Sequence, residues 1–92
     1  MRFEYDPNKS AINKAKHGID FDEAQELWEG TYIVAPLGNG HGEERLAVFG
    51  LIREKHWTAV VTERNGNIRI ISVRRSREKE EAYYDRKKED QC

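Results

Sequence analysis

The sequence predicts an α+β domain in which a mainly antiparallel sheet of four to five strands combines with two N-terminal helices and a C-terminal helix. The strongest observation is the Asn65-Gly66 pair between two β-rich runs, which is typical of a two-residue hairpin turn. A second observation is the change of period at Gly30, from helical spacing before it to runs of β-branched residues after it. Phe3 and Tyr5 alternate with charged residues, which predicts a short edge strand ahead of the helices.

The first helix is predicted to begin after Asp6, an N-cap residue, with Pro7 at the first helical position. Gly18 is suited to the left-handed conformation that ends many helices. Ile12 and Ala15 give this helix only a narrow apolar stripe with which to pack.

A second helix is predicted to begin at Asp20, with Glu23 three residues later as its capping-box partner, and to end at Gly30. A last helix is predicted from Ser76 to about residue 88, and its few apolar residues predict weak anchoring. The apolar residues of the second helix have the spacing of a buried face: Phe21, Ala24, Leu27 and Trp28.

Strands are predicted over residues 31–37, 45–53, 56–64 and 67–75. The last of these has β-branched residues on both faces, as a central strand does, together with three arginines. Regular alternation predicts that Arg69 and Arg74 point to opposite faces and that Arg75 shares the face of Arg69. The expected cross-strand pairs are Arg64 with Asn67, Thr62 with Arg69, Val60 with Ile71, and Trp57 with Arg74.

The charge distribution is uneven, although the formal net charge of the 92 residues is only −1. Residues 1–44 hold 4 Lys and Arg against 9 Asp and Glu, residues 45–77 hold 8 against 2, and residues 78–92 hold 4 against 6. A basic middle between acidic flanks is expected where one surface binds phosphate groups. Neutralisation of the arginines by the carboxylates of the flanks explains the same distribution, so both interpretations stay open.

Composition and motifs exclude several classes of protein. No stretch approaches the roughly 18 apolar residues of a membrane span, and the amino terminus lacks the apolar run of a signal peptide, so a cytoplasmic location is predicted. Cys92 is the only cysteine, so no disulfide within the chain is possible. The three histidines are scattered and no glycine-rich phosphate loop is present, so we expect no metal ion and no cofactor.

The assembled pieces resemble the BrnT family of toxins over nearly the whole chain. The Lys-His-Gly element at residues 16–18 and the Arg-Ile-Ile-Ser strand at residues 69–72 carry most of the specificity. Val73 stands where the family more often has alanine. The matching stretches are residues 3–9, 13, 16–19 and 21–24 in the first half, and residues 43–45, 50, 60–64, 68–75, 80 and 84 in the second.

This resemblance implies one domain over residues 1–92 with a RelE-like fold, acting as the ribonuclease toxin of a bacterial type II toxin–antitoxin system. It further implies metal-independent RNA cleavage that arrests translation, and neutralisation by a BrnA-type antitoxin with a ribbon-helix-helix domain. Operator DNA would then be bound only through the antitoxin complex. The alternative is a non-enzymatic binding module whose arginine-rich sheet docks RNA or an acidic partner protein.

RNA cleavage without a metal ion uses the neighbouring 2′-hydroxyl as nucleophile, and it needs a base, an acid and cations for the charge that develops on the phosphate. Arginine suits the last task because its planar fork stays charged and can bind two phosphate oxygens. Family position ranks Arg69 and Arg74 first among the catalytic candidates, followed by His17, Lys16, Glu44 and Tyr84. The candidates for RNA binding are Arg64, Arg75 and Arg45.

Four of the catalytic candidates have plain structural alternatives. His17 and Lys16 stand at a predicted helix C-terminus, where positive charge is favourable without any catalytic role. Glu44 can act as a base, or it can pair with an arginine and hold the guanidinium in place. Tyr84 can donate to a phosphate or stack on a base, but tyrosines in such helices more often pack the helix onto the sheet.

Overall fold

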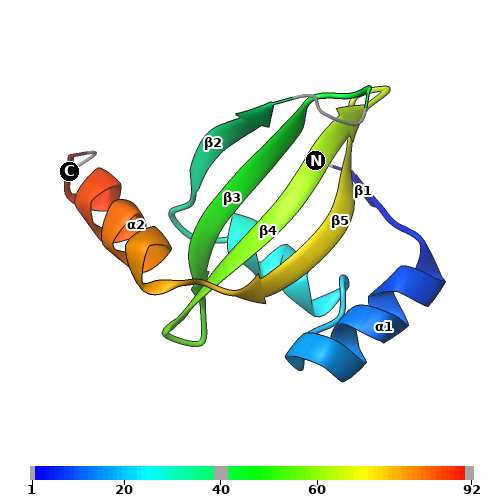
Figure 1. The fold of residues 1–92 in the computed structure, drawn as a ribbon, viewed down its shortest axis with the longest axis horizontal. Coiled ribbons are helices and arrows are strands. Elements are labelled where there is room, and N and C mark those ends of the chain that lie inside the picture. The colour runs from blue at the N-terminus through cyan, green and yellow to red at the C-terminus, as the bar shows by residue number, and fades with distance from the viewer. Residues whose placement is uncertain (1, 39–41, 91–92) are drawn as a thin grey trace.

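The computed structural model describes residues 2–38 and 42–90, which form a five-stranded sheet flanked by helices (Figure 1). Cys92 lies outside the described residues. The order of elements agrees with the predicted α+β fold. In sequence they are β1 (Phe3–Glu4), α1 (Pro7–His17), η1 (Glu23–Trp28), β2 (Ile33–Gly38), β3 (Arg45–Ile52), β4 (Lys55–Arg64), β5 (Asn67–Arg75) and α2 (Glu78–Asp90).

The sheet is mixed. Its strand order is β1-β5-β4-β3-β2, and β1 pairs with β5 in parallel while the other neighbours are antiparallel. The sequence does not indicate the parallel pair because β1 has only two residues and lies at the far end of the chain from β5. The N-terminal strand therefore lies beside the arginine-bearing strand.

The predicted helix caps are present. The Asp6 carboxylate accepts a hydrogen bond from the Asn8 N–H at 2.8 Å, and Gly18 ends α1 with a φ of 81°. Asp20 and Glu23 form the capping box, in which each carboxylate accepts from the backbone N–H of the other at 2.7 and 3.0 Å. These contacts set the directions in which α1 and η1 leave their loops.

Helix α1 is attached to the sheet by a buried polar side chain and not by its apolar stripe. Ile12 is 58% exposed and Ala15 is exposed as well. Asn13 is buried instead, and its amide donates to the backbone carbonyls of Ile19 and Val73, both at 2.8 Å. Its carbonyl oxygen accepts from the Val73 N–H at 3.2 Å. One side chain thus joins the helix, the following loop and β5.

The second helix is a single 3-10 segment of six residues and not the α-helix that was predicted. Its apolar positions are nevertheless buried as expected, with Ala24 and Leu27 at 0% and 1% exposure. Gly50 on β3 permits this close packing, because a Cβ there would lie 2.9 Å from Leu27 Cδ2. At six residues η1 is longer than most 3-10 helices, which rarely exceed about three or four residues.

The β4–β5 hairpin begins as predicted and then changes register. Asn65 and Gly66 both have positive φ, as a type I′ turn requires. The predicted pairs Arg64–Asn67 and Thr62–Arg69 are present, but the register shifts between Val61 and Val60. The predicted pairs Val60–Ile71 and Trp57–Arg74 are wrong, because Ile71 is an extra residue that forms a β-bulge. The observed pairs beyond it are Val60–Ser72, Ala59–Val73, Thr58–Arg74 and Trp57–Arg75.

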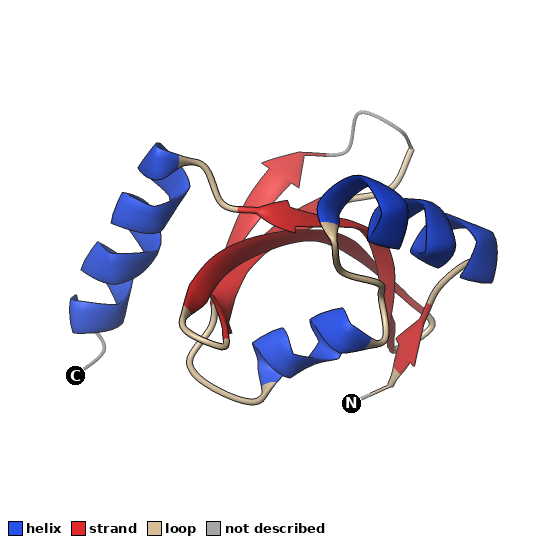
Figure 2. Cartoon of the chain, turned by 90° about the horizontal axis from the view of Figure 1, so that it is seen from below, coloured by secondary structure: helices blue, strands red, loops and turns tan. Residues whose placement is uncertain are grey.

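The two faces of the sheet have different surroundings. We call one the covered face, because the sheet arches over η1 on this side (Figure 2) and buries the larger core there. We call the other the open face, and on it α2 packs at one end. Covered-face strand residues include Val48, Ala59, Val61, Ile70 and Val73, and those of the open face include Ile33, Ala47 and Phe49.

Candidate functional site

The bulge at Ile71 brings Arg69 and Arg74 to the same face of the sheet. Ile70 and Val73 are three residues apart, yet both are buried in the core of the covered face. Their neighbours Arg69 and Arg74 therefore both lie on the open face, opposite Thr62 and Thr58 of β4. The prediction that these arginines point to opposite faces is wrong, because it assumed a regular strand.

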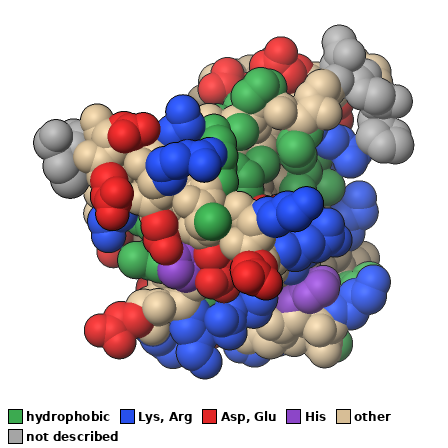
Figure 3. All heavy atoms as spheres, turned by 60° about the vertical axis from the view of Figure 1, so that its left-hand side comes forward, with side chains coloured by type: hydrophobic (Ala, Val, Ile, Leu, Met, Phe, Trp, Pro, Cys, Tyr) green, Lys and Arg blue, Asp and Glu red, His purple; other side chains and the backbone are tan. Residues whose placement is uncertain are grey.

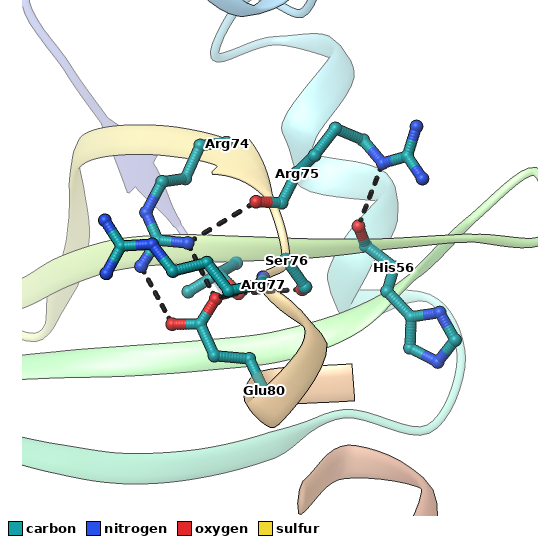
Figure 4. Close-up of polar contacts among 7 residues, drawn as sticks. His56, Arg74, Arg75, Ser76, Arg77 and Glu80 are labelled. Atoms are coloured by element: carbon teal, nitrogen blue, oxygen red, sulfur yellow. Dashed lines mark hydrogen bonds and ion pairs between the residues drawn. The ribbon is translucent and has the colours of Figure 1, made fainter. Parts of the chain in front are cut away.

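The same bulge moves Arg75 away from Arg69. The Arg75 guanidinium lies over the Trp57 ring at 5.5 Å from its centroid, and Trp57 packs against the covered-face core. The Arg75 Nε also donates to the His56 carbonyl at 3.3 Å. The prediction that Arg75 shares the face of Arg69 is therefore wrong, and Figure 4 shows Arg75 extending away from the Arg74 guanidinium.

Arg74 is held by a carboxylate from α2 (Figure 4). Its two terminal nitrogens donate to the two oxygens of Glu80 at 2.7 and 2.8 Å. Glu80 also accepts from the Arg77 N–H at 2.8 Å and from the Thr58 hydroxyl at 3.2 Å. The hydrogen bonds from Arg74 lower the pKa of Glu80 to about 2, although burial opposes this shift. The hydrogen bonds to Glu80 in turn raise the pKa of Arg74, with a further contribution from the charge of Glu80 and with burial opposing both.

Arg69 has a different environment. It is half-buried, with Glu4 of β1 on one side in register and Thr62 of β4 on the other. Across the described part of the chain, its guanidinium makes no hydrogen bond or ion pair. The Thr62 hydroxyl donates to the Glu44 carbonyl at 2.7 Å, and half-buried Arg45 begins β3 next to that carbonyl. Among the described residues, Arg69 is thus a cation on the open face with which no carboxylate forms an ion pair.

Tyr84 is buried under α2, with 2% exposure. Its hydroxyl donates to the Thr31 carbonyl at 2.9 Å, and its ring meets the His56 ring edge-on at 5.6 Å. Burial raises the pKa of the Tyr84 hydroxyl. The His56 Nε2 forms a further contact with Asp85 at 2.9 Å. Helix α2 is therefore held more firmly than its composition predicts.

Replacing Tyr84 by phenylalanine is expected to lower the free energy of unfolding by about 1 kcal/mol, because the Thr31 carbonyl loses its partner. The ring and its packing remain, so RNA cleavage should be unchanged. Denaturant unfolding and a cleavage assay on the same preparation measure both effects. Slower cleavage with unchanged stability would contradict this packing role. Tyr84 would then again be a candidate for donating a hydrogen bond to a phosphate or for supplying a proton.

None of the remaining candidates forms a hydrogen bond or ion pair with Arg69 or Arg74 within the described residues. Lys16 and His17 are exposed at the end of α1, which is joined to β5 by the hydrogen bonds of Asn13 to the Val73 backbone. The Glu44 side chain is exposed. Arg64 at the hairpin pairs with the neighbouring carboxylate, Glu43, with both distances 3.2 Å.

Figure 3 shows the side of the molecule that carries α2 and β2 in Figure 1, where hydrophobic side chains gather beside a group of lysines and arginines. Ala35 and Leu51 pack against the buried open-face residues Ile33, Ala47 and Phe49 but are only partly buried themselves. They therefore leave apolar surface on the face that carries the arginines. Leu37 on the edge strand β2 is 56% exposed. The open face thus combines apolar and basic surface.

Sequence reasoning did not assign roles to Thr58, His56 and Asp85, and it treated Ser76 only as the start of the last helix, whereas these residues join β4 to α2 and to the segment before it. The Thr58 and Ser76 hydroxyls are 2.8 Å apart. These polar contacts connect segments that are distant in sequence. The sequence has only one local signal for them, which is that Glu80 follows shortly after Arg74 and Ser76.

A model of the BrnT family, described as the ribonuclease toxin of a type II toxin–antitoxin system, matches residues 5–80. The chain belongs to the BrnT toxin family. As a BrnT toxin it is a ribonuclease that has RNA as its substrate and an antitoxin as its partner. A comparison with curated proteins found no match.

Two further observations concern the described part of this BrnT chain. No helix there is long and apolar enough to cross a membrane. Within residues 2–38 and 42–90, no three His, Cys, Asp or Glu side chains are grouped as ligands for a metal ion.

Proposed function

We propose that the open face of β5 cleaves RNA without a metal ion, with Arg69 as the principal phosphate-binding cation. The observation that carries this proposal is the bulge at Ile71, which puts Arg69 and Arg74 on one accessible face. Arg69 has no carboxylate partner among the described residues, so its guanidinium is available to an anion. Preorganised cations of this kind stabilise the charge that develops on a phosphate in the transition state.

The two arginines would contact different phosphates of one RNA strand. Along a strand, the step from Arg69 to Arg74 corresponds to roughly 15 Å, which is too far for two guanidinium groups to bind one phosphate without long reaches. Arg74 is positioned by Glu80, with its fork already ordered. Arg45 and Arg69 flank Thr62 and are the better pair for the phosphate that is cut.

We further propose that the partner is a BrnA-type antitoxin with a ribbon-helix-helix domain, and that operator DNA is bound only through it. The mixed apolar and basic open face fits a segment with apolar and acidic side chains. The target would be cytoplasmic RNA whose cleavage arrests translation, and bound antitoxin would block this cleavage.

The second candidate function is RNA or acidic-partner binding without cleavage. The bidentate Arg74–Glu80 pair favours this alternative, because that arginine is already engaged when no ligand is present. Glu80 then ties α2 to the sheet and Arg74 has a purely structural role.

Purified protein incubated with single-stranded RNA in EDTA distinguishes these functions. The proposed mechanism predicts cleavage that leaves a 2′,3′-cyclic phosphate and a 5′-hydroxyl. Activity that EDTA abolishes and a divalent ion restores would refute the metal-free mechanism. Tight RNA binding without any cleavage, in EDTA or with added divalent ions, would favour the binding module.

Addition of the antitoxin is expected to raise the melting temperature strongly, because a partner that binds only the folded state stabilises it by mass action. At 100 times the dissociation constant, the gain is about 2.7 kcal/mol. Thermal melting with and without saturating antitoxin measures it. An unchanged melting temperature, or growth arrest in bacteria that co-expression of the antitoxin does not relieve, would contradict the proposed partner.

A further inference from the structure

Two buried side-chain atoms of the described residues have no hydrogen-bond partner, and both belong to one row of residues across the open face. They are Glu4 Oε1 and Arg45 Nε. Glu4 is in register with Arg69, and Arg69 with Thr62. The β3–β4 register, continued by one residue, places Arg45 beside Thr62. The row therefore crosses β1, β5, β4 and β3.

The side chains at both ends of this row point toward the open face. Phe3 packs in the covered-face core, with its ring 4.8 Å from that of Trp28, so the next residue on the strand, Glu4, faces the other way. On β3, Leu46 packs on the covered face and Ala47 on the open face. Arg45 therefore shares the face of Ala47.

Unpaired buried polar atoms are rare in folded proteins, because each has lost its water without gaining a partner. Here a carboxylate oxygen and a guanidinium N–H are left without partners on either side of Arg69. Neither contributes a hydrogen bond to the fold. An acceptor and a donor that are ordered but unused are suited to a ligand that offers both a proton and an anionic oxygen.

We propose that Glu4 is the general base of RNA cleavage and that Arg69 and Arg45 hold the scissile phosphate beside it. This inference rests on the proposed function. The Glu4 carboxylate takes the proton of the 2′-hydroxyl while the 2′-oxygen bonds to phosphorus. The bond from phosphorus to the 5′-oxygen breaks, and the leaving oxygen takes a proton from water. A ribose 2′-hydroxyl supplies the proton and the phosphate supplies the anionic oxygens.

Glu4 fits this role better than the other carboxylates near the row. Within the described ranges no ion pair joins Glu4 to an arginine, so its carboxylate is not already committed to a cation. Glu80 is committed to Arg74. Glu44 contributes only its backbone carbonyl, to the Thr62 hydroxyl, while its side chain is exposed.

The test compares Glu4→Gln with Glu63→Gln, a matched change of an exposed β4 residue whose cross-strand partner is the covered-face residue Ile68. Cleavage is measured on a single-stranded RNA of mixed sequence, and binding on its 2′-deoxy copy, which lacks the nucleophile. Glu4→Gln should slow cleavage by about 10²–10⁴-fold, the usual contribution of a general base. Binding of the 2′-deoxy copy and the melting temperature should equal those of the parent, and Glu63→Gln should change none of these.

Each other outcome is decisive. Cleavage at the parental rate by Glu4→Gln, while Arg69→Gln is inactive, overturns the assignment of the base but leaves the arginine site intact. Loss of binding together with cleavage means that Glu4 organises the site and is not its base. A markedly lower melting temperature means that the carboxylate serves the fold, which also overturns the inference. Full activity of Arg69→Gln refutes the proposed function itself.

Discussion

Replacing Arg69 by glutamine is expected to slow RNA cleavage by about 10²–10³-fold, the typical cost of removing one preorganised donor to a transition-state charge. Glutamine keeps much of the length of the side chain but has no charge and no planar fork. Because the Arg69 guanidinium makes no hydrogen bond within the described residues, the melting temperature should change little. Cleavage rate, growth arrest on induced expression and thermal melting together measure the effect.

Arg53→Gln is the matched control for this variant. Arg53 is exposed in the β3–β4 turn, away from Arg69, and its replacement by glutamine removes the same charge. It should leave cleavage unchanged, because Arg53 is exposed and its interaction with an anion at Arg69 is screened by solvent and salt. Equal losses in the two variants would show that only net charge matters. If Arg69→Gln stays folded and as toxic as the parent, the open face is not the active site.

The second large effect concerns stability in acid and depends on Glu80. Its pKa in the folded protein is about 2, mainly because Arg74 hydrogen-bonds to it, and this is below its ordinary value of 4.5. The ionised carboxylate therefore stabilises the fold above about pH 5, and this contribution is lost as the pH falls from about 5 toward 2. The Glu80 side chain is 21% exposed, so solvent screens part of its interaction with Arg74. We therefore expect the ionised carboxylate to contribute about 1–3 kcal/mol to the free energy of unfolding.

Glu80→Gln should lower the free energy of unfolding by this amount at pH 7 and flatten its decline between about pH 5 and pH 2. Urea unfolding at several pH values measures both changes. Glu89→Gln, which alters an exposed residue on the same helix, should leave the profile unchanged. Parallel profiles for Glu80→Gln and the parent would mean that the Arg74–Glu80 pair is not the source of acid sensitivity.

Local signals in the sequence predicted most of the fold. The helix caps at Asp6 and Gly18, the capping box at Asp20 and the Asn65-Gly66 turn all act between residues close in sequence, and all are present. The parallel β1–β5 pair and the Asn13 contacts with Val73 join distant segments, so no local pattern indicates them.

The candidate site was predicted less completely for a related reason. Residue type identified Arg69 and Arg74, but their shared face depends on the bulge at Ile71, which no turn or glycine residue marks in the sequence. Glu4 stood in a predicted edge strand, and its place beside Arg69 follows only from the parallel pairing. The alternation rule therefore fails at the position where function depends on it.

The extra residue at position 71 changes how β5 should be compared with the same strand in related sequences. Deleting it would restore strict alternation and leave every side chain on its present face, with Arg69, Ser72 and Arg74 on the open face and Ile70 and Val73 on the covered face. A relative with three residues between the two arginines, in a strand without a bulge, would therefore present them on the same face as this chain does with four. The number of residues between the two arginines is thus no guide by itself to whether such a gene encodes an intact site.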